Sequence, residues 1–206
     1  MTGAESAIRS AGALILAAGE ASRAKGPKAV WPIADLPSVR RVALAALEAE
    51  TVSETVVVIG GPWADEVEAA LMGLPLEIAL NPDYAQGQSS SLKAGLGLLD
   101  PSLDTVVFLL ADQPFLTSQI LDDLLKFHWM SKAGISAPVL AGRRRNPVAF
   151  DLKRFRGDLL DLKGDIGGRE VIAAHPGALA LWPVENVPAE CFADFDTAEE
   201  YERLKK

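Results

Sequence analysis

The feature that most constrains the fold is a regular alternation of short apolar runs with segments of helical periodicity. Four apolar runs, each closed by glycine or proline, occupy residues 12–19, 54–61, 76–82 and 104–114. Segments with apolar residues at helical spacing follow them at 37–50, 63–73, 89–99 and 117–132. Strands that alternate with helices build right-handed βαβ units. The sequence therefore predicts an α/β protein with a Rossmann-like three-layer α/β/α arrangement around a mainly parallel sheet.

The pattern loosens after about residue 134. Residues 134–151 resemble two β segments around a basic turn, and residues 158–175 indicate a helix, a glycine loop and a second helix. A strand is expected at 179–184 and a closing helix at 196–206, capped by Asp196 or Thr197. No repeat or linker interrupts the 206 residues. We therefore expect a single domain over 1–206.

Composition excludes several classes of protein. The formal net charge of −8 argues against a general binder of nucleic acid or membrane surfaces. No apolar run approaches the ~20 residues of a membrane span, and the first residues lack the pattern of a signal peptide. Cys191 is the only cysteine, which excludes an internal disulfide. A cytoplasmic location is expected, and the isolated tryptophans are assigned to packing.

A fold of this class binds ligands beyond the carboxyl ends of its strands, so the loops there carry the functional predictions. The first such loop has small residues at Ala17, Ala18 and Gly19, whose backbone N–H groups suit a phosphate. Arg23 and Lys28 follow and add positive charge. On these residues alone, a solvated basic loop is an equally good interpretation. The dinucleotide motif GxGxxG and the P-loop motif are both absent.

The stretch "LAAGEASRAKGPKAV" resembles the first-loop signature LAAGxSxRxGxPK of a nucleotidyltransferase family, and in particular its molybdenum-cofactor cytidylyltransferase branch. Ala21 replaces the usual serine and Lys25 the usual glycine. The resemblance implies that Arg23 and Lys28 hold the phosphates of the nucleotide. It also implies that the nucleotide is wrapped by Leu16, Ala17, Ala18 and Gly19.

A second loop strengthens this resemblance. "NPDYAQGQSSSLKAG" is similar to the family pattern NPxWxxGxxSSLxxG, with Tyr84 in place of tryptophan. From the residues alone, the serines are suited to capping the following helix. The resemblance adds further nucleotide-binding positions: Asn81, Gly87, Ser90 and Ser91.

A third match places a carboxylate directly after a buried strand. In "FLLADQPFL", Asp112 lies where a parallel sheet binds ligands, and carboxylate oxygens suit Mg²⁺. A turn made by Asp112 with Pro114 is the alternative. The family reads L(G/A)DQP here, and the resemblance implies that Asp112 is a metal ligand. Gln113 and Ala18 both favour the cytidylyl branch over the guanylyl branch.

The remaining matches concern the acceptor substrate. "GRRRNPVAF" is similar to GxxGxPVxF, with Arg145 in place of the second glycine, and "LKGDIGGRE" is similar to LxGDxGAR. The resemblance implies that Asp165 and Arg169 contact the acceptor, although pairing with each other is an equal alternative. "FADFDTAEEYERL" resembles the tail of the family, and it suggests Asp194, at a strand end, as a second metal ligand. The implied acceptor-binding residues are Arg145, Asn146, Pro147, Asp165 and Arg169.

Together these matches imply a nucleotide-diphospho-sugar-transferase-like fold, with a nucleotide-binding part at about 11–130 and an acceptor-binding part at about 131–206. The implied reaction transfers CMP from CTP to a phosphorylated acceptor, molybdopterin being favoured, and releases pyrophosphate. Mg²⁺ is the implied cofactor, and a molybdoenzyme or its chaperone is a further candidate partner. Lys28, Arg23 and Asp112 are the implied catalytic residues, because the chemistry needs charge stabilisation more than a nucleophilic side chain.

Three alternatives remain open at this stage. One is a sugar-phosphate, polyol-phosphate or guanylyl nucleotidyltransferase. Another is a non-catalytic protein that binds a nucleotide or a cofactor, which the departures at Lys25 and Arg145 allow. A nicotinamide oxidoreductase is disfavoured because GxGxxG is missing.

Overall fold

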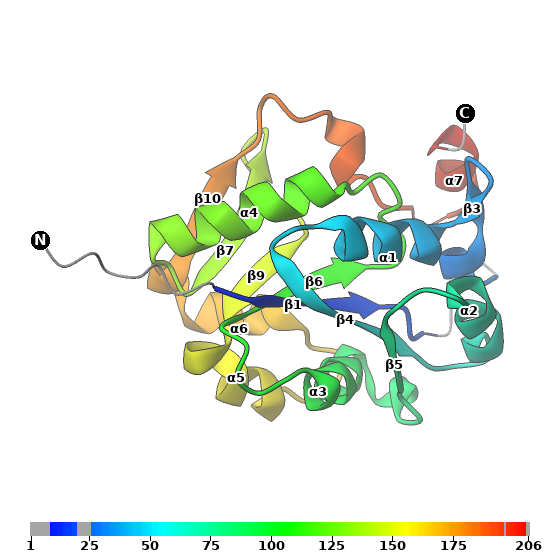
Figure 1. Ribbon diagram of the computed structural model, residues 1–206, viewed down its shortest axis with the longest axis horizontal. Helices are drawn as coiled ribbons and strands as arrows, with labels where there is room; N and C mark the ends of the chain where they lie inside the picture. The colour runs from blue at the N-terminus through cyan, green and yellow to red at the C-terminus, as the bar shows by residue number, and fades with distance from the viewer. Residues whose placement is uncertain (1–8, 20–25, 196, 205–206) are drawn as a thin grey trace, which may run out of the picture.

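The computed structural model describes residues 9–19, 26–195 and 197–204. Within these residues, one eight-stranded sheet forms the centre of the molecule (Figure 1). Its strands run in the spatial order β10-β7-β9-β6-β1-β4-β5, and β8 pairs with β7 beside this path. The bounds are β1 Ala11–Leu16, β4 Val52–Ile59, β5 Glu77–Leu80, β6 Thr105–Leu110, β7 Ile135–Leu140, β8 Arg143–Arg144, β9 Val148–Asp151 and β10 Leu179–Pro183, with a separate small hairpin of β2 Pro32–Ile33 and β3 Leu36–Pro37.

The prediction of a mainly parallel α/β sheet is confirmed. Strand β1 is parallel to both β4 and β6, β4 is parallel to β5, and β10 is parallel to β7. Strand β9 is antiparallel to β6 and β7 because the short basic turn around β8 reverses the chain. The expected pair of β segments around residues 142–147 is therefore present, and it accounts for the antiparallel part of the sheet.

Helices cover both faces of the sheet, as the predicted three layers require (Figure 1). The helices α1 Ser38–Glu48, α2 Ala64–Leu71 and α4 Ser118–Ser131 pack on one face. The helices α3 Gln88–Leu98, α5 Leu152–Asp161 and α6 Gly168–Ala174 pack on the other. The last helix, α7 Ala198–Leu204, lies near β3, and the Tyr201 hydroxyl donates to the Pro32 carbonyl at 2.7 Å.

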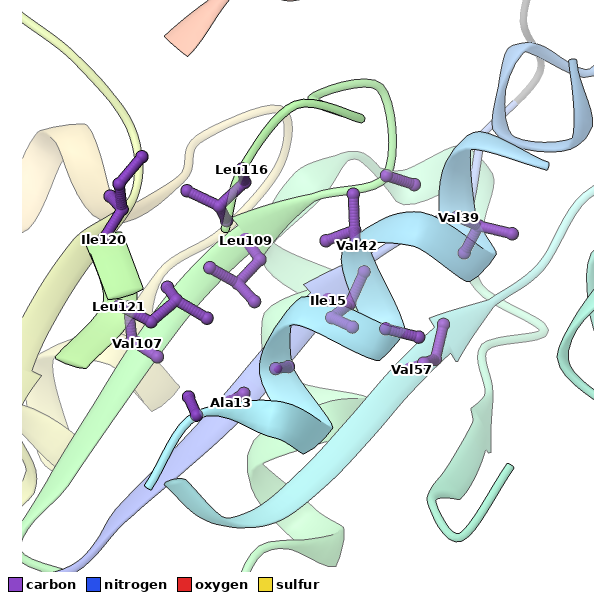
Figure 2. Packing of buried hydrophobic residues seen from close by; sticks show 14 of the residues in the cluster. Ala13, Ile15, Val39, Val42, Val57, Val107, Leu109, Leu116, Ile120 and Leu121 are labelled. Atoms are coloured by element: carbon purple, nitrogen blue, oxygen red, sulfur yellow. The ribbon is translucent and has the colours of Figure 1, made fainter. Parts of the chain in front are cut away.

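Each helical layer buries its own apolar cluster against the sheet. On the α1 and α4 face, Val39 and Val42 contact a layer that includes Ile15 of β1, all fully buried (Figure 2). They belong to the apolar stripe of α1, whose spacing follows the helical period. On the opposite face, Leu92 and Leu96 of α3 are buried in the same way. Burial on both faces explains why β1, β4 and β6 are continuous apolar runs in the sequence.

The N-terminal caps of α4 and α7 are those expected from the sequence, whereas the cap of α3 is different. Thr117 accepts the backbone N–H of Ile120 and caps α4, and Thr197 and Glu200 cap each other's backbone N–H groups before α7. Asp196, the other candidate cap, lies outside the described residues. Serine capping of α3 was the wrong expectation, because Gly87 occupies the N-cap and the Ser89 hydroxyl donates to the Gly164 carbonyl.

The order of strands creates a switch point beside β1. The chain passes from β1 outward through β4 to β5 and then returns to β6 on the other side of β1. Loops at the carboxyl ends of β1 and β6 therefore diverge and leave a crevice. No helix among the described residues is long and apolar enough to cross a membrane.

Candidate active site

A cavity of about 490 Å³ opens at this switch point. We call it the Lys28 cavity. Its wall is formed by residues that follow β1, β4 and β6 and by the first turn of α3. The lining includes Ala17, Ala18, Gly19, Lys28, Gly60, Trp63, Tyr84, Gly87, Gln88, Ser91, Asp112, Asp165 and Arg169.

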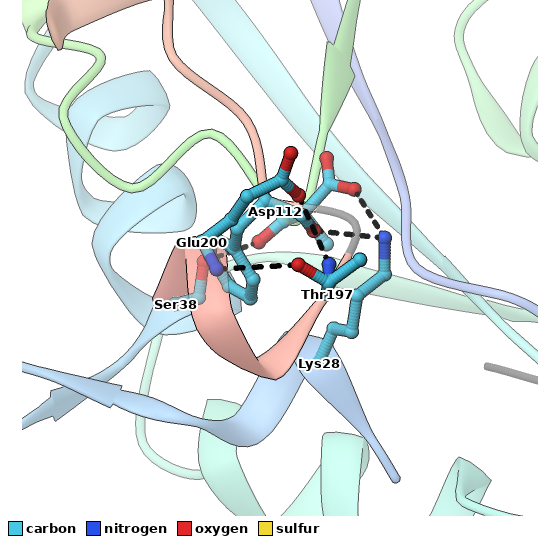
Figure 3. A network of polar contacts seen from close by, with 7 residues as sticks. Lys28, Ser38, Asp112, Thr197 and Glu200 are labelled. Carbon is cyan, nitrogen blue, oxygen red and sulfur yellow. Dashed lines mark hydrogen bonds and ion pairs between the residues drawn. The ribbon is translucent and has the colours of Figure 1, made fainter. Parts of the chain in front are cut away.

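Lys28 is held at the side of this cavity by two oxygen atoms. Its Nζ lies 3.0 Å from Asp112 Oδ2 and 3.0 Å from the carbonyl oxygen of Phe195 (Figure 3). A short 3-10 turn, Lys28–Val30, carries the lysine, whereas Asp112 follows β6. Three distant segments of the chain therefore meet at one ammonium group.

Asp112 has an oxygen that no group among the described residues satisfies. Its Oδ1 is buried and lacks a hydrogen-bond partner in the described structure. Burial raises the pKa of the Asp112 carboxyl, Lys28 opposes that rise, and the negative charge of Asp194 adds to it. The backbone just before Asp112 is fixed, because the buried Ser38 hydroxyl donates to the Ala111 carbonyl at 2.6 Å. The carboxylate is thus positioned with an acceptor atom to spare.

The donor set of this site fits a hard divalent cation with few protein ligands. Asp112 supplies the unsatisfied oxygen. The exposed Asp194 lies near enough for its negative charge to raise the pKa of Asp112. The described residues contain no group of three or more His, Cys, Asp or Glu side chains suited to a metal. Oxygen atoms of a phosphate ligand or of water would therefore complete the coordination, as Mg²⁺ prefers. The expectation that Asp194 ends a strand was wrong, since it follows the 3-10 turn Ala189–Phe192.

Most of the predicted nucleotide-binding residues lie around the Lys28 cavity. Arg23 lies outside the described residues. Asn81 and Ser90 do not line the cavity. The Asn81 amide donates to the hydroxyls of Ser90 and Ser91 at 2.9 and 3.0 Å, and of these three residues only Ser91 lines the cavity. The predicted residues that the structure does bring to the cavity are Leu16, Ala17, Ala18, Gly19, Lys28, Gly87, Ser91 and Asp112.

A second cavity, of about 360 Å³, adjoins the first. We call it the arginine cavity, because Arg144, Arg145 and Arg169 line it. The side chains of Phe108 and Phe150 also line it, with ring centroids 5.1 Å apart. The other lining residues are Leu16, Gln88, Leu92, Leu110, Asn146, Val148, Gly168 and Ile172.

The predicted acceptor residues are divided between the two cavities. Arg145 and Asn146 line the arginine cavity, and Arg169 lines both. Asp165 lines the Lys28 cavity instead, and no ion pair with Arg169 is present in the described structure. Pro147 is buried beside the arginine cavity and does not line it.

The loop before α6 is pressed against the start of α3. Gly87 has φ of +102°, and a Cβ there would collide with the backbone of Asp165. Only glycine accommodates both conditions. This contact brings Gln88 and Arg169 to the wall that the two cavities share, together with Leu16 and Leu110.

Sequence reasoning missed several residues of the site. Gln88 lines both cavities, and Trp63 and Tyr84 line the Lys28 cavity. The assignment of Trp63 to packing overlooks its place just after Gly60 and Gly61, at the carboxyl end of β4, which is an available signal. Gln88 offers no such signal, because its position depends on a loop far along the chain.

A mainly parallel sheet whose switch point carries a cation, a carboxylate and a cavity of about 490 Å³ is typical of ligand-binding α/β proteins. Comparison with known families narrows this class. Residues 13–179 match the MobA-like NTP transferase domain, and the chain belongs to that family. The predicted membership in a nucleotidyltransferase family is thereby confirmed.

Solved structures agree with this assignment. A crystal structure of an Rv0371c homolog from Mycobacterium sp. strain JC1 is 30% identical, with a TM-score of 0.82, over 95% of this chain and 94% of that one. Rv0371c of Mycobacterium tuberculosis in complex with manganese is 23% identical, with a TM-score of 0.77, over 95% and 97% of the chains. A CMP:2-keto-3-deoxy-manno-octonic acid synthetase complexed with CTP shares the fold at 14% identity, with a TM-score of 0.71 over 95% and 97%. No curated protein matches the chain.

Proposed function

We propose that this protein transfers CMP from CTP to a phosphorylated acceptor and releases pyrophosphate. The observation that carries the proposal is the unsatisfied Asp112 oxygen beside Lys28, in a cavity that shares a wall with a second cavity. Two cavities that share a wall suit two substrates that must meet. The nucleotide belongs in the Lys28 cavity and the acceptor in the arginine cavity.

The chemistry is a displacement at phosphorus. An oxygen of the acceptor phosphate bonds to the α-phosphorus of CTP, and the bond to the α–β bridging oxygen breaks, so that pyrophosphate leaves with the electron pair. The nucleophile is already an anion and needs no general base. The main difficulty is the repulsion between phosphates, which favours catalysis by positioning and by cations.

The side chains are proposed to divide this work. Lys28, with Arg23 on the first loop, neutralises the triphosphate, and Arg169 holds the acceptor phosphate at the shared wall. The N–H groups of Ala17 and Gly19 donate to the carbonyls of Val58 and Gly60 at 2.9 and 3.2 Å, so the N–H of Ala18 is the one proposed to face the phosphates. Asp112, with Asp194, would hold Mg²⁺, which supplies further neutralisation of the phosphate oxygens. The manganese complex of Rv0371c supports the use of a divalent cation.

The finer identities rest on the sequence resemblance. Ala18 and Gln113 favour the cytidylyl branch, and the CTP complex of a protein with this fold supports CTP as the donor. Gln113 distinguishes the cytidylyl branch in the sequence, but it is not proposed to contact the nucleotide. It is buried, and its amide donates to the Phe192 carbonyl at 3.3 Å. Molybdopterin is the proposed acceptor, with a molybdoenzyme or its chaperone as the recipient. One cysteine and no internal disulfide support a cytoplasmic reaction.

A thermal-shift panel tests the choice of nucleotide. CTP, GTP, ATP and UTP are compared at equal concentration with Mg²⁺, with Mn²⁺ and with a chelator. Because a ligand that binds only the folded state raises Tm, CTP with a divalent cation should give the largest shift. Pyrophosphate release with CTP and molybdopterin then tests the transfer. Equal shifts for all four nucleotides, or none, would contradict the proposal.

A further inference from the structure

The arginine cavity carries more positive charge than a single phosphate needs. Arg144, Arg145 and Arg169 line it, whereas no aspartate or glutamate does. In the described part of the chain, none of these three guanidinium groups forms a hydrogen bond or an ion pair. Arg41, by contrast, donates to the backbone carbonyls of Pro114 and Ile33. Arg144 and Arg169 are exposed to solvent, whereas Arg145 is half-buried. In a chain of net charge −8, the gathering of three arginines around one cavity favours a ligand with several negative charges.

Arg145 shows most clearly that a ligand group is expected here. Its backbone N–H donates to the Pro138 carbonyl at 2.8 Å, which fixes the residue at the base of the turn between β7 and β9. Its side-chain Nε is buried and has no hydrogen-bond partner among the described residues. A buried donor of a charged group is costly to leave unsatisfied. An anion that binds the part of the guanidinium group that lines the cavity would offset this cost by a charge-assisted contact.

The three arginines occupy different parts of the cavity. Arg169 lies on the wall shared with the Lys28 cavity, whereas Arg144 and Arg145 line the arginine cavity alone. Phe108 and Phe150 provide apolar surface in the same cavity. A phosphate at Arg169 would therefore leave Arg144 and Arg145 to a second group.

We infer that the acceptor carries a second anionic group besides the phosphate that attacks CTP. The phosphate binds Arg169 at the junction, an apolar or aromatic body covers Phe108 and Phe150, and the second anion binds Arg144 and Arg145. This inference rests on the proposed function for the assignment of the phosphate end. It makes neutral polyol phosphates poor acceptors, because they leave Arg145 unsatisfied.

Synthetic phosphate monoesters test the inference by isothermal titration calorimetry. Benzyl phosphate is compared with 4-carboxybenzyl phosphate and with the longer 4-(2-carboxyethyl)benzyl phosphate. At least one carboxylate probe should bind the wild-type protein about tenfold more tightly than benzyl phosphate, as expected for one charge-assisted hydrogen bond. Arg145→Gln, which keeps a long polar side chain, should abolish this preference. Arg143→Gln is the matched control, because Arg143 belongs to the same turn and lines neither cavity.

The outcomes separate this inference from the proposed function. Equal affinity for the probes, no binding of any probe, or a preference that survives Arg145→Gln in a folded variant would overturn the second-anion site. CTP is titrated into the same wild-type sample. CTP binding without the carboxylate preference overturns only the second-anion site. The preference without CTP binding supports that site and contradicts nucleotidyl transfer.

Discussion

The two cavities hold their cations in opposite ways. In the Lys28 cavity the ammonium group is fixed by Asp112 and by the Phe195 carbonyl, each at 3.0 Å. In the arginine cavity, the guanidinium groups have no such partners among the described residues. In the Lys28 cavity the charge is therefore in place before any ligand binds. In the arginine cavity the guanidinium groups remain available to bind an anion.

This difference suits the two tasks of a transferase. Groups that stabilise the developing charge at the α-phosphorus act best when they are preorganised, because no rearrangement is then needed during reaction. Groups that choose an acceptor act best when only the correct ligand satisfies them. Substitutions at Asp112, Lys28 and Ser38 distinguish a reactive Lys28 cavity from one whose bonds serve only stability.

The largest expected effect is that of Asp112→Asn. The amide keeps the size of the side chain but loses the charge that a divalent cation needs, so cation binding should disappear. CTP-dependent pyrophosphate release should fall by at least about 10³-fold, the upper range for losing one electrostatic stabiliser. Mn²⁺ binding is measured by calorimetry and turnover by a pyrophosphate assay. Asp123→Asn on α4 is the control and should change neither; near-normal Mn²⁺ binding by Asp112→Asn would remove Asp112 from the metal site.

Lys28→Ala should have the next largest effect. Loss of one preorganised cation is expected to lower kcat/KM for CTP by about 10²–10³-fold. Lys153→Ala is a matched control, since Lys153 also pairs with an aspartate, at 2.6 Å from Asp104, on the exposed surface. Surface pairs contribute little, so this control should leave both kcat/KM and Tm nearly unchanged. If Lys28→Ala lowers Tm but not kcat/KM, the ion pair between Lys28 and Asp112 contributes to stability and not to catalysis.

The sequence was sufficient for the elements that depend on local burial. Strands β1, β4, β5 and β6 and the helices between them follow from apolar runs and helical spacing, because both faces of the sheet are covered. The orientation of β9 did not follow, since it depends on the turn that holds β8. Serine capping of α3 failed because the Ser89 hydroxyl bonds to Gly164, 75 positions away in the sequence.

The site shows the same division between local and distant causes. The placement of Asp112 and of the first loop at a strand end could be predicted, because carboxyl ends of parallel strands meet at one edge. The shared wall could not, since Gln88 and Arg169 come together only where the loop before α6 packs on Gly87. The same packing of the loop before α6 places Asp165 in the Lys28 cavity, although the sequence predicted that it contacts the acceptor.

Acid should destabilise the packing of α4 on β7 through His128. A hydrogen bond joins its Nδ1 to Ser136 Oγ of β7 at 2.9 Å. Burial lowers the pKa of His128 to about 4, and the charges of Arg9 and Arg154 contribute to this lowering. Between pH 6.5 and 4 the unfolded chain therefore binds a proton that the folded chain does not. The free energy of unfolding should fall across this window by up to about 3 kcal/mol.

Urea unfolding at a series of pH values measures this effect. His128→Asn should flatten the dependence on pH between 6.5 and 4, even if the variant is less stable at neutral pH. His175→Asn is the control, because the side chain of His175 is largely exposed and pairs with Asp158 at 2.9 Å. It should retain the slope of the wild type. An identical slope in His128→Asn would mean that other groups cause the acid sensitivity.

The smallest expected effect concerns the support of Asp112. The Ser38 hydroxyl donates to the Ala111 carbonyl at 2.6 Å in a fully buried position, which anchors the start of α1 to the end of β6. Ser38→Ala should lower the free energy of unfolding by about 1–2 kcal/mol, since the carbonyl stays buried without its donor. Ser53→Ala is the control, because its hydroxyl makes only a 3.4 Å contact with the Ala11 carbonyl from an exposed position. If metal binding in the Lys28 cavity depends on a preorganised Asp112, Ser38→Ala should also weaken Mn²⁺ binding several-fold. Ser53→Ala should leave Mn²⁺ binding unchanged. A loss of stability with unchanged Mn²⁺ affinity would show that the Ser38 bond is not needed to keep Asp112 in position.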